Sequence, residues 1–155
     1  MILVSSCLCG EKCKYNGGDN FNQNVVTYLE EEEVIQICPE VLGGLSTPRP
    51  PAEIVGGSAR DVLEGSAKVM TQEGSDVTLA FIEGATEVLK LAKQLKARKA
   101  ILKAKSPSCG KGYVYNGQFN QTLMTGNGIT TELLLSEGIE VITEIELSEQ
   151  VKKLL

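Results

Sequence analysis

Short apolar segments alternate with helical patterns along almost the whole chain, and this alternation limits the possible folds more than any other feature. The strand-like segments are bounded by Gly, Pro or polar turns and cover residues 2–8, 34–41, 99–105 and 139–147. The helical patterns cover residues 22–33, 75–97, 126–138 and 148–155. Strands that alternate with helices form a parallel sheet with helices on both faces. We therefore expect a single α/β domain over residues 1–155, with a mostly parallel, Rossmann-like sheet of about four strands between two helical layers.

Several segments need separate predictions. The Pro-rich segment 42–54 is expected to be irregular and extended, because each Pro fixes its own backbone angle and lacks a hydrogen-bond donor. A short β-ribbon is predicted around residues 67–74, and a loop is predicted over 106–117, after the third strand. Ser148 is the expected N-cap of the last helix.

The composition excludes several classes of function. A net charge of −5 argues against an extended contact with nucleic acid or an anionic membrane, which needs clustered Lys and Arg. No apolar run approaches the roughly 18 residues that span a bilayer, and the N-terminus lacks the basic region of a signal peptide. We therefore expect a cytoplasmic protein with reduced thiols. The chain has no His, so His-based catalytic triads and His-ligated metal sites are excluded.

Three of the five cysteines follow the ends of predicted strands. Cys7 ends the first strand, Cys38 lies near the end of the second, and Cys109 comes just after the third. In a parallel sheet these ends meet at one edge, where α/β proteins bind their ligands. A single buried Cys often does no more than fill core space, but three cysteines at strand ends are better explained by one site. The sequence therefore predicts a three-thiolate metal site at this edge.

These residues leave the identity of the metal open. Zinc is bound by thiolates in four-ligand structural sites and in catalytic sites that keep one position for water. Thiolates in a reduced compartment also hold iron–sulfur clusters. Cys9 and Cys13, in the segment CLCGEKC, are both available as a fourth ligand.

Four motifs together resemble one known family. They are VSSCLCG, KYNGG, CPEVLGGLSTPRPPAEI and LKAKSPSCGKG. Their combination is similar to the thiouracil desulfurase family of iron–sulfur desulfidases, and the similarity extends over nearly the whole chain. The resemblance implies a 4Fe–4S cluster with three protein ligands, which by motif position are Cys7, Cys38 and Cys109. It also implies a hydrolytic, non-redox removal of sulfur from a small thiolated base or nucleoside.

The resemblance also assigns catalytic residues. The acidic residue after Cys-Pro corresponds to Glu40, and the Ser of the Ser-Pro-Ser-Cys loop corresponds to Ser106 or Ser108. A carboxylate is the natural proton acceptor in a chain without His, and Glu40 lies two residues beyond Cys38. The alternative role for Glu40 is that of a solvated or capping carboxylate.

Three further residues are predicted to contact the substrate. Tyr15 is expected to stack on a pyrimidine ring, with simple packing as the alternative. Arg49, boxed by Pro residues, is expected to fix a substrate oxygen, with a solvated loop position as the alternative. Asn16 stands where many members of the family carry Asp in a Tyr-Asp-Gly turn. Its amide is expected to hydrogen-bond the substrate and does not act as an acid or base.

Two other functions are compatible with these residues. A sulfurtransferase would carry a persulfide on one cysteine of low pKa and would need no metal. A non-catalytic module would hold a structural zinc ion or a fully ligated cluster. The brown colour of an iron–sulfur protein would argue against the persulfide and zinc alternatives, and a vacant iron would argue against a purely structural cluster.

Overall fold

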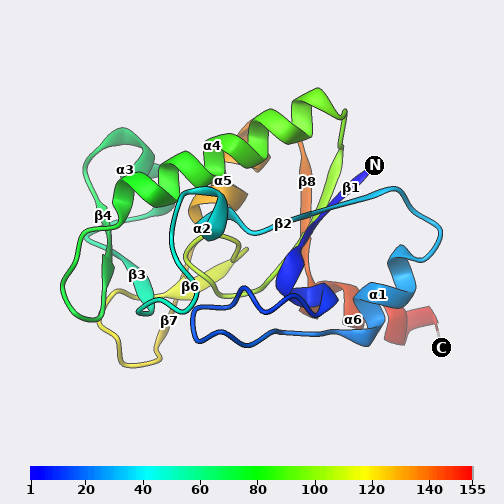
Figure 1. The fold of residues 1–155 in the computed structure, drawn as a ribbon, viewed down its shortest axis with the longest axis horizontal. Coiled ribbons are helices and arrows are strands. Elements are labelled where there is room, and N and C mark those ends of the chain that lie inside the picture. Colours follow the sequence, from blue (N-terminus) through cyan, green and yellow to red (C-terminus); the bar gives the residue numbers. More distant parts are fainter. Residues whose placement is uncertain (155) are drawn as a thin grey trace.

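The computed structural model describes residues 1–154 and contains the predicted α/β fold (Figure 1). Its main sheet has four parallel strands in the order β2-β1-β5-β8. These strands are β1 (Ile2–Ser5), β2 (Val34–Ile37), β5 (Lys99–Leu102) and β8 (Glu140–Thr143). The predicted fold class is therefore confirmed.

Helices cover both faces of this sheet. The helical segments are η1 (Ser6–Cys9, a 3-10 turn), α1 (Gln23–Leu29), α2 (Pro39–Leu42), α3 (Ala59–Glu64), α4 (Thr78–Gln94), α5 (Ile129–Ser136) and α6 (Glu144–Leu154). Helices α4 and α5 pack on one face, with α2 against α4, whereas α1 and α6 pack on the other face (Figure 1).

The core is divided between the two faces of the sheet. Successive residues of a strand point to opposite faces, so each strand contributes to two apolar clusters. Leu3 and Ala100 belong to the cluster under α4 and α5. Val4 and Ile101 belong to the cluster under α1 and α6. Burial on both faces explains why these strands are mostly apolar, with Gln36 of β2 as an exposed exception.

Two antiparallel ribbons lie outside the main sheet. The first pairs β3 (Ala52–Val55) with β4 (Lys68–Thr71), and it confirms the ribbon predicted around residues 67–74. The second pairs β6 (Tyr113–Tyr115) with β7 (Leu123–Thr125). The predictions of irregular backbone over 42–54 and of a loop over 106–117 are therefore wrong where β3 and β6 form. Both errors have the same cause, because each strand is short and pairs with a segment outside the predicted range.

All four predicted strands are too long, and β5 ends at Leu102 where the prediction continued to Lys105. Strand β1 stops at Ser5, so Cys7 lies in η1, and β2 stops at Ile37, one residue before Cys38. The largest error concerns residues 144–147, which begin α6 and do not continue β8.

Helix α6 begins early because Thr143 and Glu146 form a capping box. The Glu146 N–H donates to Thr143 Oγ1 and the Thr143 N–H donates to Glu146 Oε1, each at 3.2 Å. Ser148 therefore lies inside α6, and the prediction that it caps the helix is wrong. Within residues 1–154, none of the helices is both long and apolar enough to span a membrane.

Candidate active site

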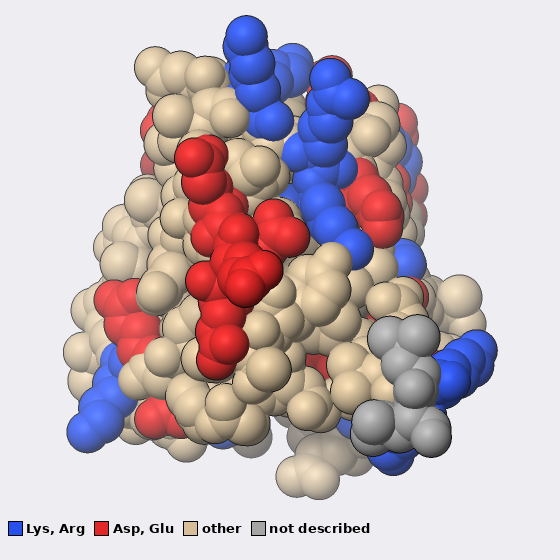
Figure 2. Space-filling model, turned by 90° about the vertical axis from the view of Figure 1, so that its right-hand side faces the viewer, with Lys and Arg blue, Asp and Glu red and all other residues tan. Residues whose placement is uncertain are grey.

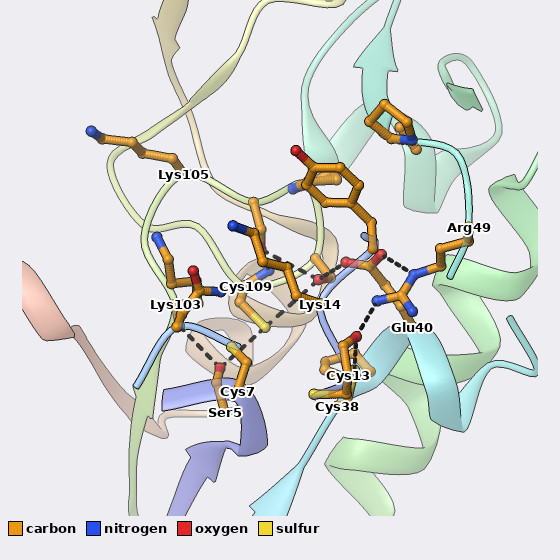
Figure 3. A pocket seen from close by; sticks show the side chains of 18 of the residues that line it. Ser5, Cys7, Cys13, Lys14, Cys38, Glu40, Arg49, Lys103, Lys105 and Cys109 are labelled. Carbon is orange, nitrogen blue, oxygen red and sulfur yellow. Dashed lines mark hydrogen bonds and ion pairs between the residues drawn. The ribbon is translucent and has the colours of Figure 1, made fainter. Parts of the chain in front are cut away.

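A cavity of about 580 Å³ opens at the carboxyl edge of the parallel sheet (Figure 3). Its lining includes the three cysteines predicted to form the metal site, Cys7, Cys38 and Cys109. Cys13 also lines it, whereas Cys9 is not among the lining residues. The sheet thus brings together cysteines that are far apart in the sequence, at the edge where α/β proteins bind ligands.

A short helix packed on α4 holds Cys38 in place. Cys38 directly precedes α2, whose first position is Pro39, where the missing N–H costs no helical hydrogen bond. Gly43 after α2 and Gly84 in α4 bring the two backbones into contact, because a Cβ on either glycine would overlap a carbonyl oxygen of the other segment. The position of Cys38, and of Glu40 within α2, therefore depends on this glycine contact.

The loop that carries Cys109 is fixed by α5. The N–H of Thr130 donates to the Ser108 carbonyl at 2.9 Å, and Thr131 Oγ1 donates to the Cys109 carbonyl at 2.8 Å. The Cys109 N–H in turn donates to Ser106 Oγ at 2.8 Å. The first turn of α5 thus uses its free N–H groups to hold a loop, which fixes the Cys109 side chain in the cavity.

The four thiols of the cavity influence one another. Hydrogen bonding from the Cys13 thiol lowers the pKa of Cys7 and lowers that of Cys38 to about 7, against the effect of burial. The same contacts raise the pKa of Cys13. Burial raises the pKa of Cys109 to about 12, although a hydrogen bond from Ser5 opposes the shift. Cys7 and Cys38 are therefore the thiols of this set most readily available as thiolates, which is the form that binds metals.

The donors of the cavity have the chemistry of an iron–sulfur site. Among the residues that the structure describes, no three His, Cys, Asp or Glu side chains form a site for a single metal ion. Cys7, Cys38 and Cys109 line one cavity, and cysteine thiolates are the usual ligands of iron–sulfur clusters.

Glu40 is held beside the thiols by two neighbours. Ser108 Oγ donates to Glu40 Oε2 at 2.8 Å. Arg49 Nε donates to Glu40 Oε1 at 3.0 Å (Figure 3). Ser108 Oγ is also 3.7 Å from Cys109 Sγ. Since a hydroxyl has one proton, Ser108 gives it to the nearer carboxylate. The carboxylate is thus linked through one hydroxyl to a predicted metal ligand.

Arg49 lines the cavity, but its guanidinium group already donates hydrogen bonds to several other groups of the protein. Besides its ion pair with Glu40, its Nη2 donates to the Cys13 carbonyl at 2.8 Å, and its Nη1 donates to the Ser46 carbonyl at 3.2 Å and to Thr47 Oγ1 at 3.0 Å. Its side chain is 7% exposed. These contacts favour a role in orienting Glu40, while the predicted contact with a substrate oxygen stays a prediction.

The other predicted residues divide into two groups. Ser106 and Tyr15 line the cavity, and Ser106 Oγ lies 3.4 Å from Ser108 Oγ. Asn16 is not among the lining residues: its side chain accepts the Gly18 N–H at 2.9 Å and closes a turn. The structure therefore brings all the predicted site residues to the cavity except Asn16, whose substrate contact stays a prediction.

Two residues of the cavity make more contacts than the sequence interpretation foresaw. Cys13 is buried between Cys7 and Cys38, and the sequence interpretation named it, together with Cys9, only as an available fourth ligand. Ser5 donates to Cys109 Sγ at 3.5 Å and accepts the Lys103 N–H at 3.0 Å. No sequence pattern pointed to Ser5, because the predicted strand continued to Leu8 and did not end at Ser5.

Comparison with known proteins now decides the family. The family model described as 2-thiouracil desulfurase matches residues 2–146. The chain belongs to this family. A solved structure described as a 4Fe–4S-dependent thiouracil desulfidase, TudS, is 42% identical, covers 99% of this chain and 96% of its own, and superimposes with a TM-score of 0.84. The uncharacterized protein YbbK of Bacillus subtilis is 49% identical over 149 residues, or 96% of this chain and 99% of YbbK. The predicted membership of the thiouracil desulfurase family is therefore confirmed.

Proposed function

We propose that this member of the 2-thiouracil desulfurase family is a 4Fe–4S-dependent desulfidase that hydrolyses the C=S group of a small thiolated pyrimidine, as a base or a nucleoside. The name of TudS, at 42% identity, supports the class of substrate and cofactor. The observation that carries the proposal is the contact chain in which Ser108 links Glu40 to Cys109. It sets a proton-accepting group directly beside a thiol-lined cavity.

Three cysteines would hold the cluster. Cys7, Cys38 and Cys109 come from three different strand ends and face one cavity, which fits a cluster with three protein ligands. When bound there, the cluster would supply a thiophilic Lewis acid that polarises the C=S bond.

The residues of the chain then handle the protons. Glu40 accepts a proton from the water that attacks the thiocarbonyl carbon, and Arg49 keeps the carboxylate in place. Ser108, hydrogen-bonded to Glu40, passes a proton toward the departing sulfur, and Ser106 lies within reach of Ser108. The overall reaction converts C=S and H₂O into C=O and H₂S, so no electrons enter or leave.

The features of the surface favour a small substrate. The face in Figure 2 carries acidic and basic side chains in adjoining groups and no continuous basic surface, which nucleic-acid binding would need. A cavity of about 580 Å³ is of the size usual for small-molecule sites, roughly 300–1,000 Å³. Tyr15 would contact the ring of such a substrate. A cytoplasmic location agrees with a site made of free thiols.

The proposal is tested with protein reconstituted without oxygen. We expect it to bind about four irons and four sulfides per chain, as a cubane cluster does, and to release sulfide and uracil from 2-thiouracil. Metal-free protein is the control, and it should release none. Stoichiometric zinc without iron uptake, or sulfur transfer to an added thiol by metal-free protein, would contradict the proposal and favour the structural or persulfide alternatives.

A further inference from the structure

The turn between β6 and β7 forms a wall of the cavity that has no assigned role. Tyr115 at the end of β6, and Phe119 and Gln121 in the turn, all line the cavity together with Glu53 of β3. We define Tyr115, Phe119 and Gln121 as the base wall. None of these residues belongs to the thiol and carboxylate machinery described above.

A buried carboxylate fastens this turn to β3. Glu53 is only 9% exposed, and its Oε1 accepts the N–H groups of Gly117 at 2.9 Å and Phe119 at 3.2 Å. Gly117 has a φ of 87° and lies so close to β3 that a Cβ would come within 2.5 Å of the Ile54 carbonyl oxygen. The turn is therefore a fixed part of the cavity wall, since a flexible loop would not be held by a buried carboxylate and a close backbone contact.

Two residues of the base wall have strained backbones. Phe119 has a φ of 55° and Gln121 a φ of 61°, in the left-handed region that non-glycine residues seldom occupy. Such conformations persist only where the surroundings impose them, and they gather at ligand clamps. Both strained residues line the cavity, so the strained backbone lies in its wall.

The chemistry of these side chains matches the part of a pyrimidine that does not react. The base has a flat ring, which an aromatic side chain can stack on. Next to the reacting C=S it also has an edge with one carbonyl acceptor and one N–H donor, and a Gln amide offers one donor group and one acceptor to such an edge. Since the thiols and Glu40 take the sulfur, this edge is left for other residues that line the cavity, among them the base wall.

We infer that the base wall recognises the pyrimidine: Phe119 packs on the ring and Gln121 hydrogen-bonds its carbonyl and N–H edge, with Glu53 as the residue that positions both. The inference rests on the proposed function for the orientation of the substrate. The recognised class is a neutral planar heterocycle with a carbonyl next to a ring N–H.

The test measures base binding and catalysis separately. Binding of uracil to the reconstituted protein is followed by calorimetry, and KM and kcat are measured with 2-thiouracil. In Gln121→Ala and Phe119→Ala, the Kd for uracil and the KM should rise about 10-fold, as expected for one lost hydrogen bond or packing contact. The kcat should change less than about threefold, and the absorption of the cluster should not change. Gln118→Ala is the matched control, because Gln118 is exposed in the same turn and is not among the lining residues.

Two further variants separate recognition from structure. Gln121→Gly relieves the positive φ while removing the amide, so it should raise the melting temperature and still weaken uracil binding as much as Gln121→Ala does. Glu53→Ala should raise the KM with the cluster and kcat retained, and Glu53→Gln, which keeps an acceptor oxygen, should restore most of the affinity.

Each outcome decides the inference. Unchanged Kd and KM in both alanine variants, or wild-type protein that does not bind uracil, would overturn it. If the wild-type protein binds uracil but releases no sulfide, the proposed function fails, and the Kd values of the variants still decide whether this wall recognises the base.

Discussion

Two sides of one cavity are built from different kinds of structure. We define the sulfur wall as Cys7, Cys13, Cys38 and Cys109. Three of them follow the ends of strands in the buried parallel sheet, and Cys13 lies in the loop between η1 and α1. The base wall lies on a separate two-stranded ribbon, fastened by Glu53 of a second ribbon. In Figure 1 these ribbons stand to one side of the main sheet.

Because of this difference, the two walls should tolerate substitutions to different degrees. The cysteines of the sulfur wall are tied into the two main cores or into helix ends, so a change there disturbs the core as well as the site. The ribbon of the base wall has exposed strand residues, and it contacts β3 and, through the bridge between Lys105 and Val114, the loop after β5. Changes in the sulfur wall should therefore abolish function, whereas changes in the base wall should give graded effects on affinity.

The largest expected effect is loss of the cluster. Cys38→Ser or Cys109→Ser should lower the iron content of reconstituted protein from about four per chain to near zero, because each removes one of three ligands. Cys7→Ser should do the same. Iron analysis and visible absorption measure the result.

The two remaining cysteines are the controls for this comparison. Cys9→Ser should leave the cluster intact, since Cys9 is not among the lining residues, and Cys13→Ser should retain most of it. If Cys13→Ser lost the cluster as completely as Cys38→Ser, all four members of the sulfur wall would be ligands, and the three-ligand proposal would fail.

The next largest effect tests whether Glu40 is a catalytic residue or a ligand of the cluster. Glu40→Gln keeps the size of the side chain and removes its basicity, so turnover should fall about 10²–10⁴-fold, the usual range for a lost general base. Iron content should stay near that of the wild type, and 2-thiouracil should still perturb the cluster absorption. Loss of the cluster in this variant would make Glu40 structural, and normal turnover would move the proton-handling role to another group.

The sulfur wall and the base wall also differ in how much of each could be predicted from the sequence. The parallel sheet and the convergence of Cys7, Cys38 and Cys109 were predictable, because buried strands are continuous apolar runs and strand ends share an edge. The roles of Phe119 and Gln121 were not, since the carboxylate that fixes their turn lies 64 and 66 residues from the N–H groups it binds. Nothing local in the sequence reports such a contact.

Arg49 and α6 show two intermediate cases. Arg49 was predicted to reach the cavity, but its pairing with Glu40 depends on the fold of α2 and of the Pro-rich segment after it. The start of α6 could have been predicted from the sequence, because Thr143 and Glu146 have the spacing of a capping box. The apolar residues around them favoured a longer strand instead, and the capping signal was the correct one.

A smaller effect tests the glycine contact that supports the sulfur wall. Gly84→Ala places a methyl group against the Pro39 backbone, so it should destabilise the protein by about 1–3 kcal/mol, as overpacking does. Because α2 carries Glu40 and follows Cys38, cluster retention after mild heating should fall as well. Glu83→Ala, at an exposed position one residue earlier in α4, is the control. Reduced stability with unchanged cluster retention would show that α2 can shift without moving the site.

The smallest effect concerns β8, the strand of the main sheet whose end carries no thiol. Thr143→Ala removes the side-chain oxygen that accepts the Glu146 N–H, and loss of such a cap costs about 1 kcal/mol. Thr143 does not line the cavity, and the thiols sit on the other strand ends, so turnover and iron content should not change. Thr143→Ser, which keeps the hydroxyl, should restore most of the stability in urea unfolding. A drop in turnover with an intact cluster would show that the end of β8 supports the site, and the contrast between the sulfur wall and the rest of the sheet edge would then be weaker than proposed.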